Sequence, residues 1–167
     1  VEAVARIRSD IPRLRLRIIG AGEERENLIQ LSDRLGVRQL VEFSEGFVPV
    51  EAIPKMIEDA NVGLIPLRIS SGTDIMLPTK LLEYVTVGIP CIVPKTRTIS
   101  RYFDSEMVRF FDAEDVDSLA QAILDLYRRP EQCESLARRA TERFGRSHTW
   151  STHKQVYVGL VHELLNS

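Results

Sequence analysis

The 167-residue sequence is 44% hydrophobic and 28% charged, which describes a folded domain with a core and excludes disordered and fibrous chains. Its formal net charge of −2 gives no overall attraction to nucleic acid or to an anionic membrane, so an anionic ligand has to be held by a local pocket. No apolar run approaches the roughly twenty residues of a membrane-spanning helix, and no signal-peptide pattern is found, so we expect a cytoplasmic protein.

The N-terminal part of the chain predicts alternating helices and strands. Apolar residues recur at positions 1, 4 and 7, which predicts a short amphipathic helix over residues 1–8. Residues 14–19 alternate apolar side chains with arginine and lead into Gly20-Ala21-Gly22, which predicts a strand that feeds a glycine turn. A helical period follows over residues 23–35. The same criteria predict a strand at 40–43, a turn at 44–46, a helix at 50–60 and a strand at 61–66.

Residues 70–94 combine a glycine-bearing loop, a helix and a buried strand. Pro78 suits the first turn of the helix because its missing N–H would have no partner there, and Gly88 suits the helix end. The first amides of this helix therefore face the preceding loop without partners. The apolar run between Pro90 and Pro94 predicts a core strand.

The remaining elements change character along the chain. The sequence predicts a helical turn at 98–103, a strand at 107–111, a helix at 116–127, a charged helix at 131–144, a break at 145–149 and a final helix at 150–165. Strands thus stop near Phe111 while helices continue. We expect a single α/β domain over residues 1–167, with a Rossmann-like, doubly wound parallel sheet and a C-terminal helical extension over 131–167.

The glycine turn after the first predicted strand indicates a phosphate site. A turn of this kind at a helix N-terminus presents backbone amides to an anion. The pattern G-x-G-x-x-G is incomplete, because Arg25 holds the position of the third glycine. Nicotinamide dinucleotide binding is therefore not expected.

Ligands of doubly wound sheets bind at the carboxyl ends of the strands, and the loops there carry a specific chemical inventory. They offer backbone amides, hydroxyl groups, one cation at Lys80 and one carboxylate at Glu83. Together these groups suit a phosphorylated sugar, with Lys80 on the phosphates and Glu83 accepting hydrogen bonds from a pair of sugar hydroxyls. The alternative is a surface ion pair between Lys80 and Glu83, which lie three residues apart on one helix face. The amides and hydroxyls belong to Gly20, Gly22, Ser70, Ser71, Gly72, Thr73 and Thr79.

Other conspicuous residues have structural explanations. The cysteines, Cys91 and Cys133, lack metal-ligand spacing and are expected to be reduced packing residues. Trp150 is expected to anchor the last helix. The histidines at 148, 153 and 162 lack ligand spacing, and the basic face with Arg138, Arg139, Arg143 and Arg146 is expected to be a solvated surface, so neither a metal site nor nucleic-acid binding is predicted.

The segment LPTKLLEYVTVGIPCIV resembles the donor-site segment of family 4 retaining glycosyltransferases, in which the C-terminal half of a GT-B fold binds a nucleotide sugar. The likeness runs in order through IIGAG, LVEFSEGFV and ANVGLIPL to the helix at Trp150. It implies that Glu83 is the second glutamate of an E-x7-E motif and holds the ribose. It further implies that Thr79 and Leu82 flank the diphosphate, Gly20 and Gly22 line the cleft, and Phe47 and Val48 meet the base. Gly72, Thr73, Asp74 and Pro78 are further donor-binding residues by this resemblance.

Two departures from the family pattern bear on the sugar. Ile75 stands eight residues before Glu83, where the first glutamate of the motif is expected, and Asp74 is one residue out of register. Either Asp74 substitutes for that glutamate or the sugar is read differently. We also expect that the first strand of the domain and an N-terminal acceptor domain precede Val1, so this chain alone is not expected to catalyse transfer.

The resemblance implies a retaining hexosyltransferase that needs no metal or cofactor and uses a UDP- or GDP-sugar. The acceptor would be a sugar, lipid or protein held by the N-terminal domain, with peripheral membrane association of the complete protein as a possibility. The alternative is a non-catalytic Rossmann-like module that binds a nucleotide or a partner. A GT-B epimerase or phosphorylase is less favoured, because the sequence lacks the context of a cofactor lysine.

Overall fold

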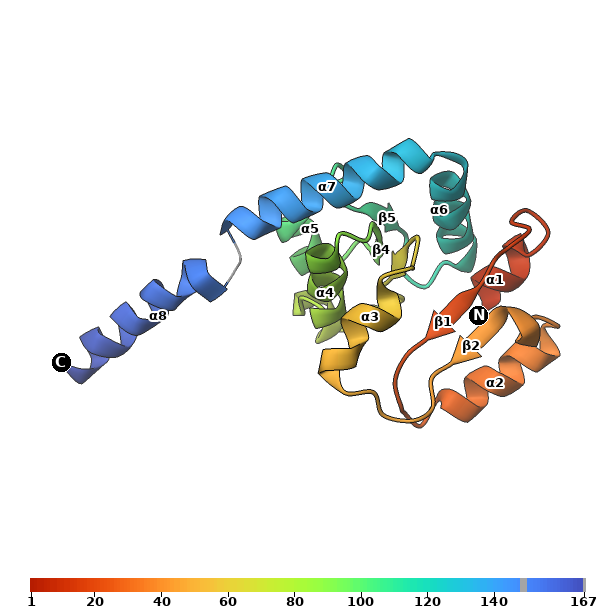
Figure 1. Ribbon diagram of the computed structural model, residues 1–167, viewed down its shortest axis with the longest axis horizontal. Coiled ribbons are helices and arrows are strands. Elements are labelled where there is room, and N and C mark those ends of the chain that lie inside the picture. Colours follow the sequence, from red (N-terminus) through yellow and green to blue (C-terminus); the bar gives the residue numbers. More distant parts are fainter. Residues whose placement is uncertain (148–149, 167) are drawn as a thin grey trace.

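The computed structural model describes residues 1–147 and 150–166 (Figure 1). Helices and strands alternate through the first two thirds of the chain, and helices alone follow. The helices are α1 (Glu2–Ile7), α2 (Arg25–Arg34), α3 (Ile53–Ile57), α4 (Thr79–Val87), α5 (Arg97–Tyr102), α6 (Val116–Arg128), α7 (Pro130–Ser147) and α8 (Trp150–Leu165). The strands are β1 (Leu16–Ile18), β2 (Val41–Phe43), β3 (Gly63–Leu64), β4 (Cys91–Pro94) and β5 (Arg109–Phe111). Short 3-10 helices are η1 (Arg38–Leu40), η2 (Val50–Ala52) and η3 (Thr73–Ile75).

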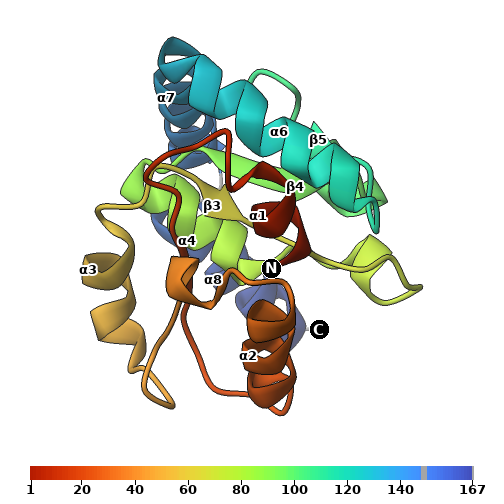
Figure 2. The same ribbon diagram turned by 90° about the vertical axis from the view of Figure 1, so that its right-hand side faces the viewer.

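All of the strand pairs described are parallel, as expected for a doubly wound α/β domain. They form two groups, β1–β2 and β3–β4–β5, in place of one continuous ladder. In both views α6 and α7 lie at the top of the molecule near β4 and β5, and α2 lies at the opposite end (Figures 1 and 2).

Strand β4 has apolar side chains on both faces of the sheet, and helices cover both faces. Its four residues are all buried, and the first three alternate between two core clusters. Cys91 and Val93 pack with residues of α4, α5 and α7, whereas Ile92 packs with residues of α6. A strand with apolar side chains on both faces is typical of a parallel sheet between helices. The α/β fold class predicted from the sequence is therefore confirmed.

Helix α4 ends where its sequence predicts. Gly88 follows the last helical residue with φ +83°, a left-handed conformation that suits glycine. Pro78, expected in the first turn, is instead the residue before the helix, with φ −66° and ψ 128°. Strand β3 approaches α4 so closely that a Cβ on Gly63 would lie 2.5 Å from the Tyr84 ring. This contact requires glycine at position 63.

Several predicted boundaries differ from the structure. The helix expected over 50–60 is split into η2 and α3, because Pro54 lacks an N–H and suits a helix start. The strand expected over 61–66 is paired only at Gly63 and Leu64. The break expected at 145–149 is wrong at its start, because α7 continues to Ser147; positions 148 and 149, with His148, lie outside the described residues. A glycine inside a helix costs only about 1 kcal/mol, which packing of α7 on α4 offsets.

The C-terminal helix differs most from expectation. Figure 1 shows α8 extending away from the other elements. Trp150 is 66% exposed and packs against Tyr157 of the same helix, so it does not anchor α8 in a core. The apolar side chains of α8 are also exposed, including Val156, Leu160 and Leu164. Among the described residues, no helix is both long and apolar enough to cross a membrane.

Both cysteines are free thiols, as predicted. Cys91 lies in the core strand β4, and burial raises the pKa of its thiol to about 12. Cys133 is half-buried on α7, and burial likewise raises its pKa. These thiols act as packing groups in the core.

Candidate functional site

The loops after β1 and β2 are joined by one serine. The Ser44 hydroxyl accepts a hydrogen bond from the Gly20 N–H at 2.9 Å and lies 3.4 Å from the carbonyl oxygen of Gly46. Gly20 has φ +129°, and a Cβ at Gly20 or Gly22 would meet nothing within 4 Å. The glycine turn is thus open to a ligand and held in place from β2. The role of Ser44 was not predicted, although its position directly after a predicted strand is a usable signal.

The next loop presents an aromatic side chain to solvent. Phe47 is 83% exposed, and Val48 is half-buried beside it. Arg25, which occupies the position of the third glycine, is turned to the neighbouring strand and places its guanidinium 5.6 Å from the Phe43 ring centroid. Its Nε is buried and has no hydrogen-bond partner in the described part of the chain. Arg25 therefore packs α2 against β2 through a cation–π contact.

The loop between β3 and α4 is braced by its own hydroxyl groups. The Thr73 hydroxyl accepts from the Ser70 N–H at 2.7 Å and donates to the Arg68 carbonyl at 2.6 Å. The Ser70 hydroxyl in turn accepts from the Thr73 N–H at 3.1 Å. Both hydroxyl groups thus form hydrogen bonds within the loop, and Gly72 between them is exposed. This loop offers a ligand its backbone and exposed side chains such as Ser71, Ile75 and Met76.

The first turn of α4 presents free donors. The first intrahelical bond runs from the Leu81 N–H to the Pro78 carbonyl at 3.1 Å. The N–H groups of Thr79 and Lys80 precede it, and neither has an acceptor among the described residues. Both residues are exposed, so the amides and the Lys80 ammonium can reach an anion.

Lys80 and Glu83 do not form the surface ion pair that was the alternative to a binding role. Within the described residues, neither side chain makes an ion pair or a hydrogen bond. Glu83 is half-buried and lies beside Tyr84, whose pKa is raised by burial and by the nearby Cys91 and Glu83. A carboxylate in such a position has its acceptor sites available for a ligand.

Glu83 lies on a groove between α3 and α4. The groove has a volume of about 340 Å³, which is within the range of small-molecule sites. It brings together Thr79, Leu82 and Glu83 of the predicted site with apolar side chains of η2 and α3. Lys80, Phe47 and Val48 do not line it, although Val50 does. Its lining residues are Val50, Ile53, Pro54, Ile57, Thr79, Leu82, Glu83, Thr86 and Val87.

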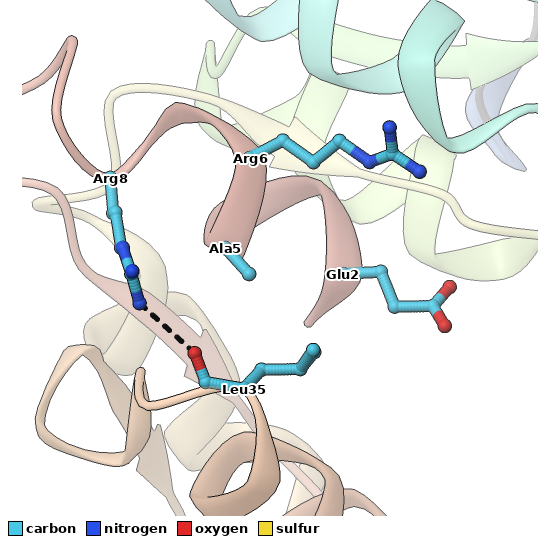
Figure 3. Close-up of a pocket in the computed structure, with 5 residues that line it drawn as sticks. All are labelled: Glu2, Ala5, Arg6, Arg8 and Leu35. Carbon is cyan, nitrogen blue, oxygen red and sulfur yellow. Dashed lines mark hydrogen bonds between the residues drawn. The ribbon is translucent and has the colours of Figure 1, made fainter.

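Another pocket lies beside α1 and the end of α2 (Figure 3). It has a similar volume of about 340 Å³ and contains two arginines. The Arg8 guanidinium donates to the Leu35 carbonyl at 3.0 Å, and Arg6 is paired with Asp117 at 2.6 Å. Both cations thus already have a partner within the protein, whereas the Lys80 ammonium at α4 has none among the described residues.

The basic face of α7 is also engaged. Arg138, Arg139 and Arg143 pair with Glu142, Glu106 and Asp104, respectively. These three arginines match the solvated surface predicted for the face, and the Arg146 side chain lies outside the described residues.

Comparison with known proteins identifies the family. The family model described as glycosyl transferases group 1 matches residues 1–143. A curated relative, the GDP-mannose-dependent alpha-(1-6)-phosphatidylinositol monomannoside mannosyltransferase of Mycolicibacterium smegmatis, is 27% identical over 139 residues. The match covers 81% of this chain and 36% of the relative, so the chain spans about a third of that protein.

Solved structures show the same fold. Sucrose-phosphate synthase from Thermosynechococcus elongatus superposes with a TM-score of 0.83 at 18% identity, over 99% of this chain and 42% of the synthase chain. The pneumococcal O-GlcNAc transferase GtfA, in complex with UDP and GlcNAc, gives a TM-score of 0.79 at 17% identity, over 99% of this chain and 32% of the transferase chain. The chain therefore belongs to the group 1 family of glycosyl transferases and has the fold of the C-terminal domain of a GT-B glycosyltransferase.

Proposed function

We propose that this domain binds the nucleoside diphosphate sugar donor of a retaining hexosyltransferase. One observation carries the proposal. The Thr79 and Lys80 N–H groups, which have no acceptor among the described residues, lie at the start of α4 beside a groove that contains Glu83. Similar proteins support a nucleotide donor, since the mycobacterial relative is GDP-mannose-dependent and the GtfA structure contains UDP. A UDP- or GDP-hexose is the donor class that we expect.

The start of α4 would stabilise the departing diphosphate. Negative charge develops on the diphosphate as the sugar leaves, so donors fixed at that position favour the transition state. A helix N-terminus contributes only about 0.3–1 kcal/mol toward an exposed anion. The Lys80 ammonium adds a charge-assisted hydrogen bond of about 1.5–3 kcal/mol, which makes it the larger contributor. No metal or cofactor is required by this scheme.

The nucleoside would lie between the groove and the loops of the first two strands. Glu83 would accept hydrogen bonds from the ribose hydroxyls, with Thr79 and Leu82 beside it. Exposed Phe47 and neighbouring Val48 offer an apolar surface for the base, and open Gly20 and Gly22 let the donor approach the backbone. The name of the mycobacterial relative includes phosphatidylinositol monomannoside. In the complete protein, the acceptor would be held by a further domain, in the cytoplasm.

We also propose that a further parallel strand, N-terminal to α1, lies between β1 and β3. Residues of a parallel strand point their N–H and C=O groups alternately to either side. The Ile18 carbonyl oxygen accepts a hydrogen bond from the Ser44 N–H, which follows β2. The backbone N–H and C=O of the preceding residue, Arg17, therefore point to the other edge of β1. The Ile65 N–H donates to the Ile92 carbonyl of β4. The backbone N–H and C=O of Leu64 therefore point to the other edge of β3.

Helix α1 indicates where this strand would come from. It packs against β1 and β2 through Val4 and against α6 through Ala3 and Ile7, and α6 in turn contacts β4 and β5. A crossover helix covers the two parallel strands that it connects, and one side of β1 is already occupied by β2. A strand that precedes α1 would therefore lie at the open edge of β1.

The test of the donor proposal is a screen of UDP-, GDP- and ADP-sugars with the complete protein. Sugar transfer or donor hydrolysis is the expected result. Nucleotide binding without any turnover would instead support a non-catalytic nucleotide-binding module.

A further inference from the structure

The loop between β3 and α4 is fixed to a second element through Asp74. Its carboxylate accepts a hydrogen bond from the Arg97 backbone N–H at 2.8 Å, and its other oxygen lies 3.2 Å from the Arg97 Nε. The Asp74 side chain is 29% exposed, whereas that of Arg97 is 74% exposed. The backbone bond is therefore the more sheltered of the two contacts.

This hydrogen bond gives an acceptor to one of the first N–H groups of α5. The first N–H groups of a helix have no acceptor within the helix. Thr96 caps α5 by accepting from the Ile99 N–H at 3.2 Å, which leaves the Arg97 N–H without a local acceptor. Asp74, 23 residues earlier in the chain, supplies that acceptor. The loop after β3 and the helix after β4 are thus connected at the edge of the sheet where the donor is proposed to bind.

Because of this connection, the loop exposes the Ile75 side chain to solvent more than that of Asp74. Asp74 directs both carboxylate oxygens to Arg97, so each oxygen already has one donor within the protein. The next residue, Ile75, is 63% exposed, and the loop then leads directly into Pro78 and the first turn of α4. Movement of Asp74 would therefore shift both Ile75 and the entry to α4.

We propose that Asp74 is a positioning residue, which fixes the loop between β3 and α4 to α5 and thereby sets the entry to the first turn of α4. This inference rests on the proposed donor site. Of the two contacts, the hydrogen bond to the Arg97 N–H is expected to hold the loop, because an ion pair with an exposed arginine contributes little to stability.

Variants of the complete protein separate the two contacts. Asp74→Ala removes both, Asp74→Asn keeps an oxygen acceptor for the Arg97 N–H, and Arg97→Ala keeps the N–H while removing the guanidinium. We expect Asp74→Ala to raise the donor KM about five- to tenfold with kcat changed less than about twofold, because about 1 kcal/mol of loop ordering is lost. Asp74→Asn should recover most of this loss, and Arg97→Ala should stay within about twofold of wild type.

Amide hydrogen exchange provides a readout that is independent of activity. Asp74→Ala should accelerate exchange at residues 73–76 and 97, while Asp74→Asn should not. Asp104→Ala is the matched control, since Asp104 also caps a backbone N–H, that of Glu106, and pairs with an arginine, but on α7. It should leave the donor KM and the exchange of residues 73–76 unchanged.

Two results would overturn the positioning role of Asp74. One is that Asp74→Asn is as damaging to the donor KM as Asp74→Ala, which would mean that the charged carboxylate itself binds the sugar. The other is unchanged exchange at residues 73–76 in Asp74→Ala. Failure of the donor proposal is distinguishable, because the wild-type protein would then show no turnover while the exchange effect of Asp74→Ala persisted.

Discussion

Glu83 is the residue on which donor recognition depends most. It is half-buried on the groove and has no hydrogen bond to lose within the described residues, so Glu83→Ala should leave the free energy of unfolding within about 0.5 kcal/mol of wild type. The variant should lose discrimination between ribonucleotides and 2′-deoxyribonucleotides, because the acceptor for the ribose hydroxyls is gone. Calorimetric titration measures this, with exposed Glu58→Ala as the control. Unfolding of the Glu83 variant would instead make Glu83 a structural group.

Lys80 should act through its charge. Lys80→Met keeps much of the side chain and removes the ammonium, so nucleoside diphosphate binding should weaken about tenfold, with a smaller dependence on salt. The exposed lysine of α3, Lys55→Met, is the control and should bind as wild type. Equal affinities for all three proteins would contradict the assignment of the diphosphate to the start of α4.

Cys91 should be chemically inert near neutral pH. Burial raises its thiol pKa from 9.0 to about 12, so the folded state disfavours the thiolate that alkylating reagents attack. In the unfolded chain this thiol ionises near pH 9, so its contribution to stability is constant below that pH and declines as the pH rises above it. Mass spectrometry after iodoacetamide treatment at pH 8 should show Cys133 modified before Cys91. Faster modification of Cys91 would show that β4 opens readily.

At the scale of elements, the contact between β3 and α4 leaves no room for a side chain. Gly63→Ala would place a Cβ 2.5 Å from the Tyr84 ring, so we expect a loss of about 1–3 kcal/mol in the free energy of unfolding. Urea denaturation measures this. Gly22→Ala, where a Cβ meets nothing, should be neutral, and Tyr84→Leu should partly rescue the Gly63 variant. A neutral Gly63→Ala would mean that α4 moves freely on the sheet.

The sequence predicts an element well where a single residue sets its end. Pro78 and Gly88 define α4, and both the loop before it and the strand after it are found where expected. The pairing of Asp74 with Arg97 is not predictable in this way, because 23 residues separate the two and only the fold brings them together. The short length of β3 is also a tertiary effect, since one of its edges has no partner strand in the described residues.

At the scale of the whole molecule, the open edges of β1 and β3 yield a further prediction. In this 167-residue chain, the amides of Arg17 and Leu64 should exchange rapidly with solvent. In the complete protein, a strand between them should slow that exchange at least about a hundredfold. The Ile65 amide, already bonded to Ile92, is the control and should be protected in both proteins. Equal exchange of Leu64 in the two proteins would argue against an inserted strand.

The central claim is that the groove with Glu83 and the start of α4 bind a nucleoside diphosphate. Titration of this chain with UDP and GDP, followed by NMR, tests it most directly. We expect weak binding, with a Kd on the order of 0.1–10 mM for a domain that holds part of the site. Shifted amides should cluster at residues 20–22, 47–48 and 79–83. Shifts confined to residues remote from these loops, such as those of the pocket in Figure 3, would contradict the claim.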